Sequence, residues 1–149
     1  MKWITREHAK VDRIACPWLI KNFVDKDAQF LFVPAHRVID IAKEENAIPF
    51  DIPNVELGHH DKECSFDAII KKYELDKKDS TFMELAKIVR GADTPNRSLT
   101  PQSEGLFAIA VGFSISSKDD YENMTKQFPV YDALYSFCKS DKKALTTRH

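Results

Sequence analysis

Strand-like and helix-like segments alternate in the first part of this chain, and only helix-like segments follow. Residues Lys2–Arg6 alternate in side-chain character, and residues 28–33 form a β-type run that Pro34 stops. Residues 55–58 are short, lean apolar and end in glycine, so we predict a third strand there. Strands separated by helices, and then helices alone, favour a small sheet beside a helical half.

Prolines and apolar runs predict where the helices begin and which of them are buried. Proline is tolerated in the first turn of a helix and costly in its interior, so we predict that helices start at Pro17 and at Pro129. Residues 105–113 are apolar nearly all round, which predicts the buried centre of the C-terminal half. Further helices are expected over residues 36–45, 65–75, 79–90 (ended by Gly91), from Thr100-Pro101 onward and over 119–127.

The overall prediction is one α/β to α+β domain over residues 1–149. It has a small sheet of about three short strands with helices between them, followed by a mainly helical C-terminal half. The chain is 149 residues long, 43% hydrophobic and 30% charged, which is typical of a globular domain and not of a disordered one. We expect residues 142–149 to be a flexible tail.

Charge and cysteine content narrow the class of protein. A net charge of −1 offers no basic field, so direct nucleic-acid binding is not expected. The N-terminus lacks the continuous apolar segment of a secretory signal, and the run at 105–113 is too short to span a bilayer. Three cysteines without a disulfide-scaffold spacing indicate reduced thiols, and so a cytoplasmic protein.

Chemistry concentrates where the third predicted strand gives way to a helix. His59 and Cys64 could ligate a divalent metal such as zinc or iron, with Glu56 and Asp93 as oxygen donors. His60 would point elsewhere in an extended chain. The structural alternative is that His59 closes a strand end and that Cys64 is a small buried hydrophobe.

Two cysteines share one predicted setting. Cys16 and Cys64 both precede a predicted helix, where the pKa of a thiol falls, and Arg13 would lower that of Cys16 further. If the two helix starts converge, their side chains would suit an oxyanion, a metal or thiol redox chemistry. Packing alone is the alternative for Cys16. Ser65 is predicted as a helix cap and Cys138 as a core residue.

The pair Asp12 and Arg13 admits two interpretations. The two side chains could bind a ligand, or they could form a structural tie with each other or with the loop that carries Asp93. With four glycines and no phosphate-binding glycine loop, the chain is not expected to hold a nucleotide.

Several blocks of the sequence resemble, in order, the C-terminal domain of the bacterial chromate-resistance family ChrB. They lie at residues 3–6, 12–20, 49–53, 64–68, 90–94 and 131–135, and they span nearly the whole chain. The resemblance implies a role in chromate resistance and places the family's histidine on His59. Longer relatives add an N-terminal region that regulates transcription, and others add a sulfurtransferase-like domain, so we expect a stand-alone form here.

These observations lead to three hypotheses. The first is a stress-response protein that binds a small inorganic ion, either a metal or an oxyanion, for sensing or detoxification. The second is a thiol-based redox enzyme resembling a chromate reductase, and the third is a non-catalytic regulatory module; a homodimer fits each of them. Whether the protein is an enzyme stays open. The assigned residues are Glu56, His59 and Asp93 for the metal, Asp12 and Arg13 for the ligand, and Cys16 and Cys64 as catalytic thiols.

Overall fold

A small parallel sheet organises the N-terminal half. The computed structural model describes residues 1–140, so the predicted tail at 142–149 lies outside the described residues. Within residues 1–140 the sheet has three strands, β1 (Lys2–Arg6), β2 (Gln29–Val33) and β3 (Ala47–Pro49), in the order β2-β1-β3. Both neighbours run parallel to β1, which confirms the predicted small sheet and puts β1 at its centre.

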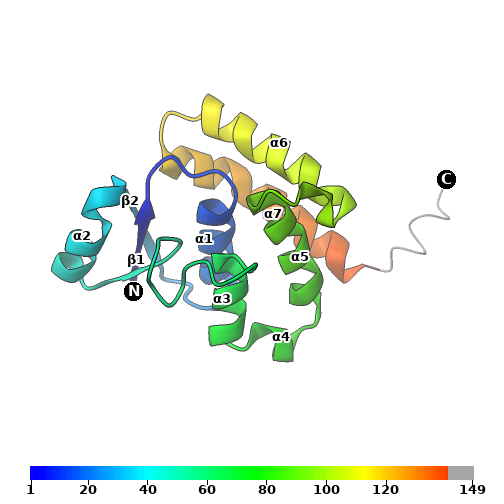
Figure 1. The fold of residues 1–149 in the computed structure, drawn as a ribbon, viewed down its shortest axis with the longest axis horizontal. Coiled ribbons are helices and arrows are strands. Elements are labelled where there is room, and N and C mark those ends of the chain that lie inside the picture. Colours follow the sequence, from blue (N-terminus) through cyan, green and yellow to red (C-terminus); the bar gives the residue numbers. More distant parts are fainter. Residues whose placement is uncertain (141–149) are drawn as a thin grey trace.

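Helices cover both faces of this sheet. Helix α1 (Asp12–Phe23) connects β1 to β2, and α2 (Val38–Glu45), after a 3₁₀ turn at Ala35–Arg37, connects β2 to β3. Figure 1 shows α1 and α2 on opposite sides of the strands. The alternation of strand side chains explains this arrangement, because Trp3 belongs to the larger core around α1 and Ile4 to the smaller core under α2.

The C-terminal half is helical, as predicted. Helix α7 crosses α1 and α5 in Figure 1, and its Tyr131 is buried against Trp18 of α1 with ring centroids 6.1 Å apart. The elements are α3 (Ser65–Lys72), α4 (Leu75–Lys78), α5 (Thr81–Asp93), a 3₁₀ turn at Arg97–Leu99, α6 (Pro101–Ser116) and α7 (Asp120–Lys139). No helix within residues 1–140 combines the length and the apolar character needed to cross a bilayer.

The third strand is not where we predicted it. Residues 55–58 form turns, and β3 lies earlier, at Ala47–Pro49. Asp51 and Asn54 have φ angles of 50° and 64°, so the chain leaves the sheet and turns back on itself directly after β3. Pro49 is compatible with a strand here because β3 is an edge strand.

Both proline-based helix starts are wrong. Helix α1 begins at Asp12 and α7 at Asp120, so Pro17 and Pro129 lie inside their helices. The starts are set by carboxylate caps from outside each helix. Asp93 accepts a hydrogen bond from the backbone N–H of Asp12 (3.3 Å), and Asp119 accepts one from Glu122 (2.8 Å). The Thr100-Pro101 start is confirmed, since the Thr100 side chain accepts from the N–H of Ser103.

Gly91 does not end its helix. Helix α5 continues to Asp93, so Asp93 lies on the last turn of the helix rather than in a loop. A Cβ at Gly91 would come within 2.3 Å of the Ser103 Oγ. Glycine is therefore needed there for the close approach of α5 and α6, and not for a left-handed cap.

Helix α6 is not the buried centre that its composition predicts. Leu106 and Ala110 are buried, whereas Ile109 is 44% exposed and Ile115 is 80% exposed. Helix α6 lies on the outside of α5 and α7 (Figure 1), and the centre of this half is formed by α1, α5 and α7. An all-round apolar pattern does not say how many sides of a helix have neighbours.

Candidate functional site

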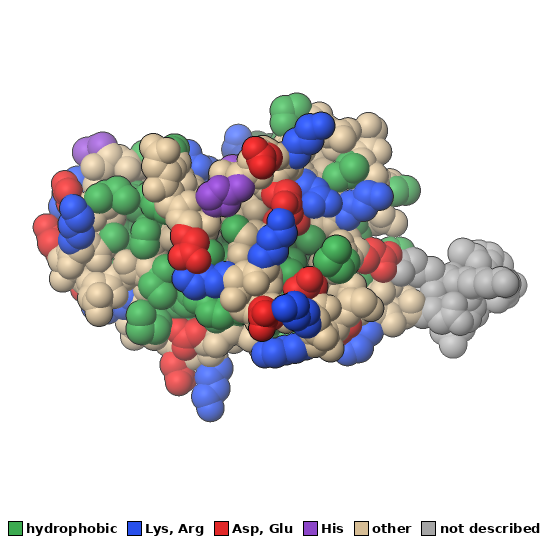
Figure 2. Space-filling view, turned by 60° about the horizontal axis from the view of Figure 1, so that its bottom comes forward, with side chains coloured by type: hydrophobic (Ala, Val, Ile, Leu, Met, Phe, Trp, Pro, Cys, Tyr) green, Lys and Arg blue, Asp and Glu red, His purple; other side chains and the backbone are tan. Residues whose placement is uncertain are grey.

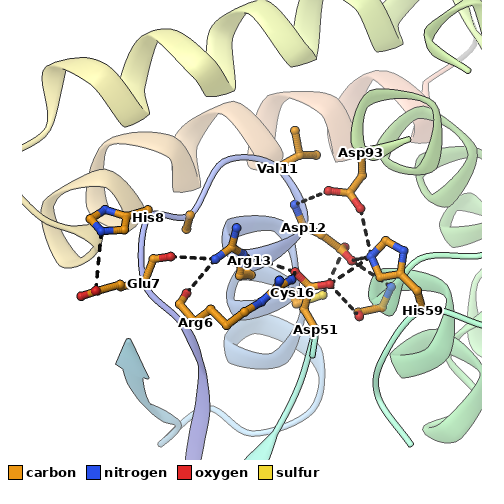
Figure 3. A network of polar contacts seen from close by, with 12 residues as sticks. Arg6, Glu7, His8, Val11, Asp12, Arg13, Cys16, Asp51, His59 and Asp93 are labelled. Carbon is orange, nitrogen blue, oxygen red and sulfur yellow. Dashed lines mark hydrogen bonds and ion pairs between the residues drawn. The ribbon is translucent and has the colours of Figure 1, made fainter. Parts of the chain in front are cut away.

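One histidine faces three carboxylates in this fold. The Nε2 atom of His59 lies 3.0 Å from Asp51 Oδ1, 3.2 Å from Asp93 Oδ2 and 3.5 Å from Asp12 Oδ2 (Figure 3). They come from three parts of the chain: Asp12 begins α1, Asp51 and His59 lie in the connection between β3 and α3, and Asp93 ends α5. The structure thus brings His59 and Asp93, predicted as metal ligands, together with Asp12, predicted to bind the ligand.

The sheet explains why these segments meet. Arg6 is the last residue of β1 and Asp51 follows β3 by two residues, so both lie at the carboxyl ends of parallel strands. Helix α1 also begins at this edge, with Asp12 as its first residue. In open parallel sheets, ligands bind beyond the carboxyl ends of the strands, and the His59 cluster occupies that position.

Asp12 is a buried hub between two helices. Its side chain is 0% exposed, and it accepts hydrogen bonds from the backbone N–H groups of Ser65 (2.8 Å) and Phe66 (3.2 Å) at the start of α3. Asp93 in turn accepts from the N–H of Asp12 at the start of α1. Two helix N-termini therefore meet at this site, and each is satisfied by a carboxylate from another helix.

Ser65 has a different role from the predicted one. The N-cap of α3 is Cys64, whose backbone N–H donates to Asp67 Oδ2 at 3.0 Å. Ser65 is the first residue of the helix, and its Oγ donates to Asp51 Oδ1 at 3.2 Å. Ser65 therefore orients the Asp51 carboxylate toward His59.

Arg13 forms a structural tie to Asp51 and the backbone. Its Nε lies 3.4 Å from Asp51 Oδ2, while NH1 donates to the carbonyls of Arg6 (3.1 Å) and Glu7 (2.7 Å). Figure 3 shows this guanidinium between the end of β1 and Asp51. The tie predicted for Arg13 was to Asp12 or to the loop of Asp93, whereas its carboxylate partner in the structure is Asp51.

The protonation of the cluster is governed by burial and by the close approach of its groups. Hydrogen bonds to Asp12, Asp51 and Asp93 raise the pKa of His59 to about 12, so the imidazole is protonated at neutral pH. Burial, together with the nearby Asp93 charge, raises the pKa of Asp12 to about 7. Burial also raises the pKa of Asp93. Asp51 also has the Arg6 and Arg13 guanidinium groups beside it, whereas within residues 1–140 Asp12 and Asp93 form ion pairs only with the imidazolium of His59.

The donor atoms have the spacing that a metal ion requires. One ligand atom each from Asp12, Asp51 and His59 lies within 4.8 Å of the others, and the same is true of Asp12, Cys64 and Asp93. Oxygen and imidazole donors suit divalent ions such as Mn²⁺, Fe²⁺ and Zn²⁺. Asp51 was not predicted from the sequence, because its segment between Pro49 and Pro53 has the pattern of an extended connector.

Glu56 does not join the cluster. Its carboxylate lies on the surface beside the Nζ of Lys72, at 2.9 Å. Its backbone carbonyl contacts the Nε2 of His60 at 2.7 Å, so His60 points away from His59, as predicted. Glu56 was predicted as a metal ligand because it lies three residues before His59 in an expected strand. Residues 51–58 form turns instead, so that spacing does not bring the Glu56 carboxylate to the site.

The two cysteines near the site are buried and not activated. Cys16 and Cys64 are each 0% exposed, and burial raises the pKa of both thiols well above the ordinary value. Cys16 lies inside α1 and not at its start, and its thiol donates to Asp12 Oδ1 at 3.4 Å. Cys64 is at the start of α3, but burial raises the pKa of its thiol all the same. Cys138 is buried in the core, as predicted.

His59 lines three of the cavities formed by residues 1–140. One, of about 250 Å³, is polar and holds the Asp12, Asp51 and Asp93 carboxylates. Another, of about 700 Å³, is also lined by His59. Its remaining lining includes Arg90, Thr94, Pro95, Asn96 and Leu99. The surface turned toward the viewer in Figure 2 carries interspersed acidic and basic side chains, in keeping with the net charge of −1.

Comparisons with known proteins agree with the blocks found in the sequence. The family profile "ChrB, C-terminal domain" matches residues 3–138. Protein ChrB of Cupriavidus metallidurans is 28% identical over 142 residues, which cover 95% of this chain and 42% of that protein. The chain thus spans less than half the length of this relative, and no solved structure matches. The chain therefore belongs to the ChrB C-terminal domain family, the chromate-resistance family that its sequence blocks resemble.

Proposed function

We propose that this domain binds one divalent metal ion at the His59 cluster and contributes to chromate resistance through it, in sensing or in detoxification. The observation that carries the proposal is the approach of three carboxylates from three segments to a single imidazole nitrogen. Asp12, Asp51 and His59 are the proposed ligands, and Asp93 is the fourth donor. This set replaces Glu56 with Asp51 and Asp12.

Charge supports a cation in this position. Burying carboxylates is costly unless they are paired, and Asp12 and Asp51 are 0% and 6% exposed. In the metal-free state the imidazolium supplies the compensating charge. A divalent ion displaces that proton, because a histidine ligand must be neutral, and it adds one further positive charge to the site.

A second candidate function follows from the same contacts. The polar side chains already satisfy one another, since His59 pairs with the carboxylates and Arg13 ties Asp51 to β1. A regulatory or interaction module could use the imidazolium as its permanent cation. A thiol redox enzyme has less support, because the thiols of Cys16 and Cys64 are buried with raised pKa values.

Metal titration separates these functions. The metal-free protein is titrated calorimetrically with Mn²⁺ and Zn²⁺ at pH 8, next to H59A and D51N. E56Q is the matched control, because Glu56 is a surface carboxylate three residues from His59. The metal centre predicts one ion per chain for the wild type and for E56Q, and affinity at least tenfold weaker in both site variants. Equal metal affinity in all four proteins, or no metal binding by the wild type, would favour the regulatory module in which the His59 imidazolium is the permanent cation.

A further inference from the structure

The same polar cavity that holds the carboxylates also has a cationic side. Arg6, Lys10, Arg13 and Arg97 all line the cavity of about 250 Å³ together with Asp12, Asp51, Asp93 and His59. The four basic side chains do not have equal partners. Their existing contacts determine which positive charges are free for a ligand.

Arg13 is fully engaged, and Arg6 is engaged in part. Arg13 donates to two backbone carbonyls and lies against Asp51. The terminal nitrogen of Arg6 lies 3.7 Å from the same carboxylate, but its buried Nε has no hydrogen-bond partner. The carboxylate charge of Asp51 is thus shared between two guanidinium groups, and Arg6 retains an unused donor.

Lys10 and Arg97 are the free cations of this cavity. Within residues 1–140 neither side chain forms an ion pair. The Arg97 guanidinium lies 3.6 Å from the ring centroid of Phe107, which fixes its plane, and its buried Nε lacks a hydrogen-bond partner. A buried N–H group without an acceptor is destabilising, and the Nε groups of Arg6 and Arg97 are both of this kind.

We propose that this cavity takes a tetrahedral oxyanion group that lies against Lys10, Arg97 and Arg6 and completes the coordination of the metal. The inference rests on the proposed metal centre and names its co-ligand. Guanidinium and ammonium groups on one wall supply the donors that such an anion requires. The carboxylates on the other wall repel an anion, so the metal ion must be present before the anion binds.

The size of the cavity limits the ligand. A water molecule takes up roughly 30 Å³ in the liquid, so a space of about 250 Å³ holds a metal ion, one oxyanion and a few waters. The group could come from a free inorganic anion or from a small phosphate monoester, and these two sources share the same recognition chemistry.

Calorimetry of the Mn²⁺-loaded protein tests this assignment. Inorganic phosphate, sulfate and glycerol phosphate are titrated into the wild type, R97Q and K10Q. K43Q removes the same charge from the exposed face of α2 and serves as the control. We expect binding of at least one anion to the wild type and K43Q, at least tenfold weaker binding to R97Q and K10Q, and Mn²⁺ affinity within about twofold in all four.

The outcomes separate this inference from the metal centre itself. Mn²⁺ binding without anion binding would overturn the anion subsite and leave the metal centre in place. Equal anion affinity in R97Q and K10Q, or in metal-free protein, would also overturn the subsite. Failure to bind Mn²⁺ would overturn the proposed metal centre. Lys10 is exposed, so K10Q provides the comparison even if R97Q does not fold. Tighter binding of inorganic phosphate than of glycerol phosphate would identify a free anion as the source.

Discussion

Asp93 caps the helix that Asp12 begins, with its Oδ1 accepting the backbone N–H of Asp12 at 3.3 Å. Asp12 repeats the arrangement by accepting from Ser65 and Phe66 at the start of α3. Two of the three carboxylates that face His59 are therefore also the groups that join α5 to α1 and α1 to α3. The same carboxylates form the candidate site and hold the helices together. Substitutions of Asp12 or Asp93 should therefore change the stability of the domain as well as metal binding.

Loss of the Asp12 carboxylate should destabilise the domain. In D12A two N–H groups at the start of α3 lose their acceptor and His59 loses one of its partners. Leaving buried polar groups unpaired costs about 3 kcal/mol in the free energy of unfolding, measured by urea denaturation. D12N keeps one oxygen acceptor and should lose less. Equal and small losses in both variants would show that Asp12 does not hold the helices together.

Metal-free protein should lose its His59 contribution as the pH rises. The pKa of His59 is about 12 in the folded state and near 6.5 in an unfolded chain. Its stabilisation is therefore fully present below pH 6.5 and decreases between pH 6.5 and 12. With EDTA present, the difference in unfolding free energy between wild type and H59Q should be smaller at pH 9.5 than at pH 6. A difference that grows with pH would contradict the imidazolium assignment.

A second pH effect should arise far from the site. The Tyr135 hydroxyl donates to Asp79 Oδ2 at 2.7 Å, and this bond holds the pKa of Asp79 well below its usual range. Y135F removes the hydroxyl and keeps the ring, so it should cost about 1 kcal/mol at pH 7. Because the folded-state pKa of Asp79 is lowered, its contribution is present above the unfolded pKa and falls away below about pH 4. The cost of Y135F, measured by urea denaturation at several pH values, should fall in that range; a constant cost would argue against the ionised bond.

The cysteines should be unreactive in the native protein. Cys16 and Cys64 are buried with raised thiol pKa values, so native protein at pH 7.5 should react with iodoacetamide only as fast as it unfolds. In denaturant, both should react at the rate of an ordinary thiol, as followed by mass spectrometry. Rapid alkylation of either residue in the native state would restore the redox hypothesis.

Local patterns predicted the elements better than their ends. The strands β1 and β2 and most helices were found from alternation and helical spacing. The predictions based on Pro17 and Gly91 were wrong because contacts with other segments decide both positions. The Asp93 carboxylate of α5 caps α1 at Asp12, five residues before Pro17, and close packing against Ser103 requires a glycine inside α5. Tertiary contacts of this kind leave no mark in a local window of sequence.

The candidate site was predicted in part for the same reason. His59 and Asp93 stood out by residue type and by the family blocks. A convergence of two helix starts was considered, but the first of them was placed at Pro17 and lies at Asp12. Asp51 was missed because its importance comes from β3, whose position beside β1 is a long-range pairing. Glu56 was included because a strand was expected at residues 55–58, where the chain turns instead. The free cations Lys10 and Arg97 could be recognised only after the partners of Arg13 were known.

Anomalous diffraction from crystals of the protein grown with Mn²⁺ tests the metal centre most directly. The proposed centre predicts a single strong peak about 2.2 Å from Asp51 Oδ1 and His59 Nε2, with the His59 ring no longer hydrogen-bonded to the carboxylates. The same crystals of D51N should lack the peak. A wild-type map without a peak in this cavity, with His59 still paired to Asp51 and Asp93, would contradict the metal centre.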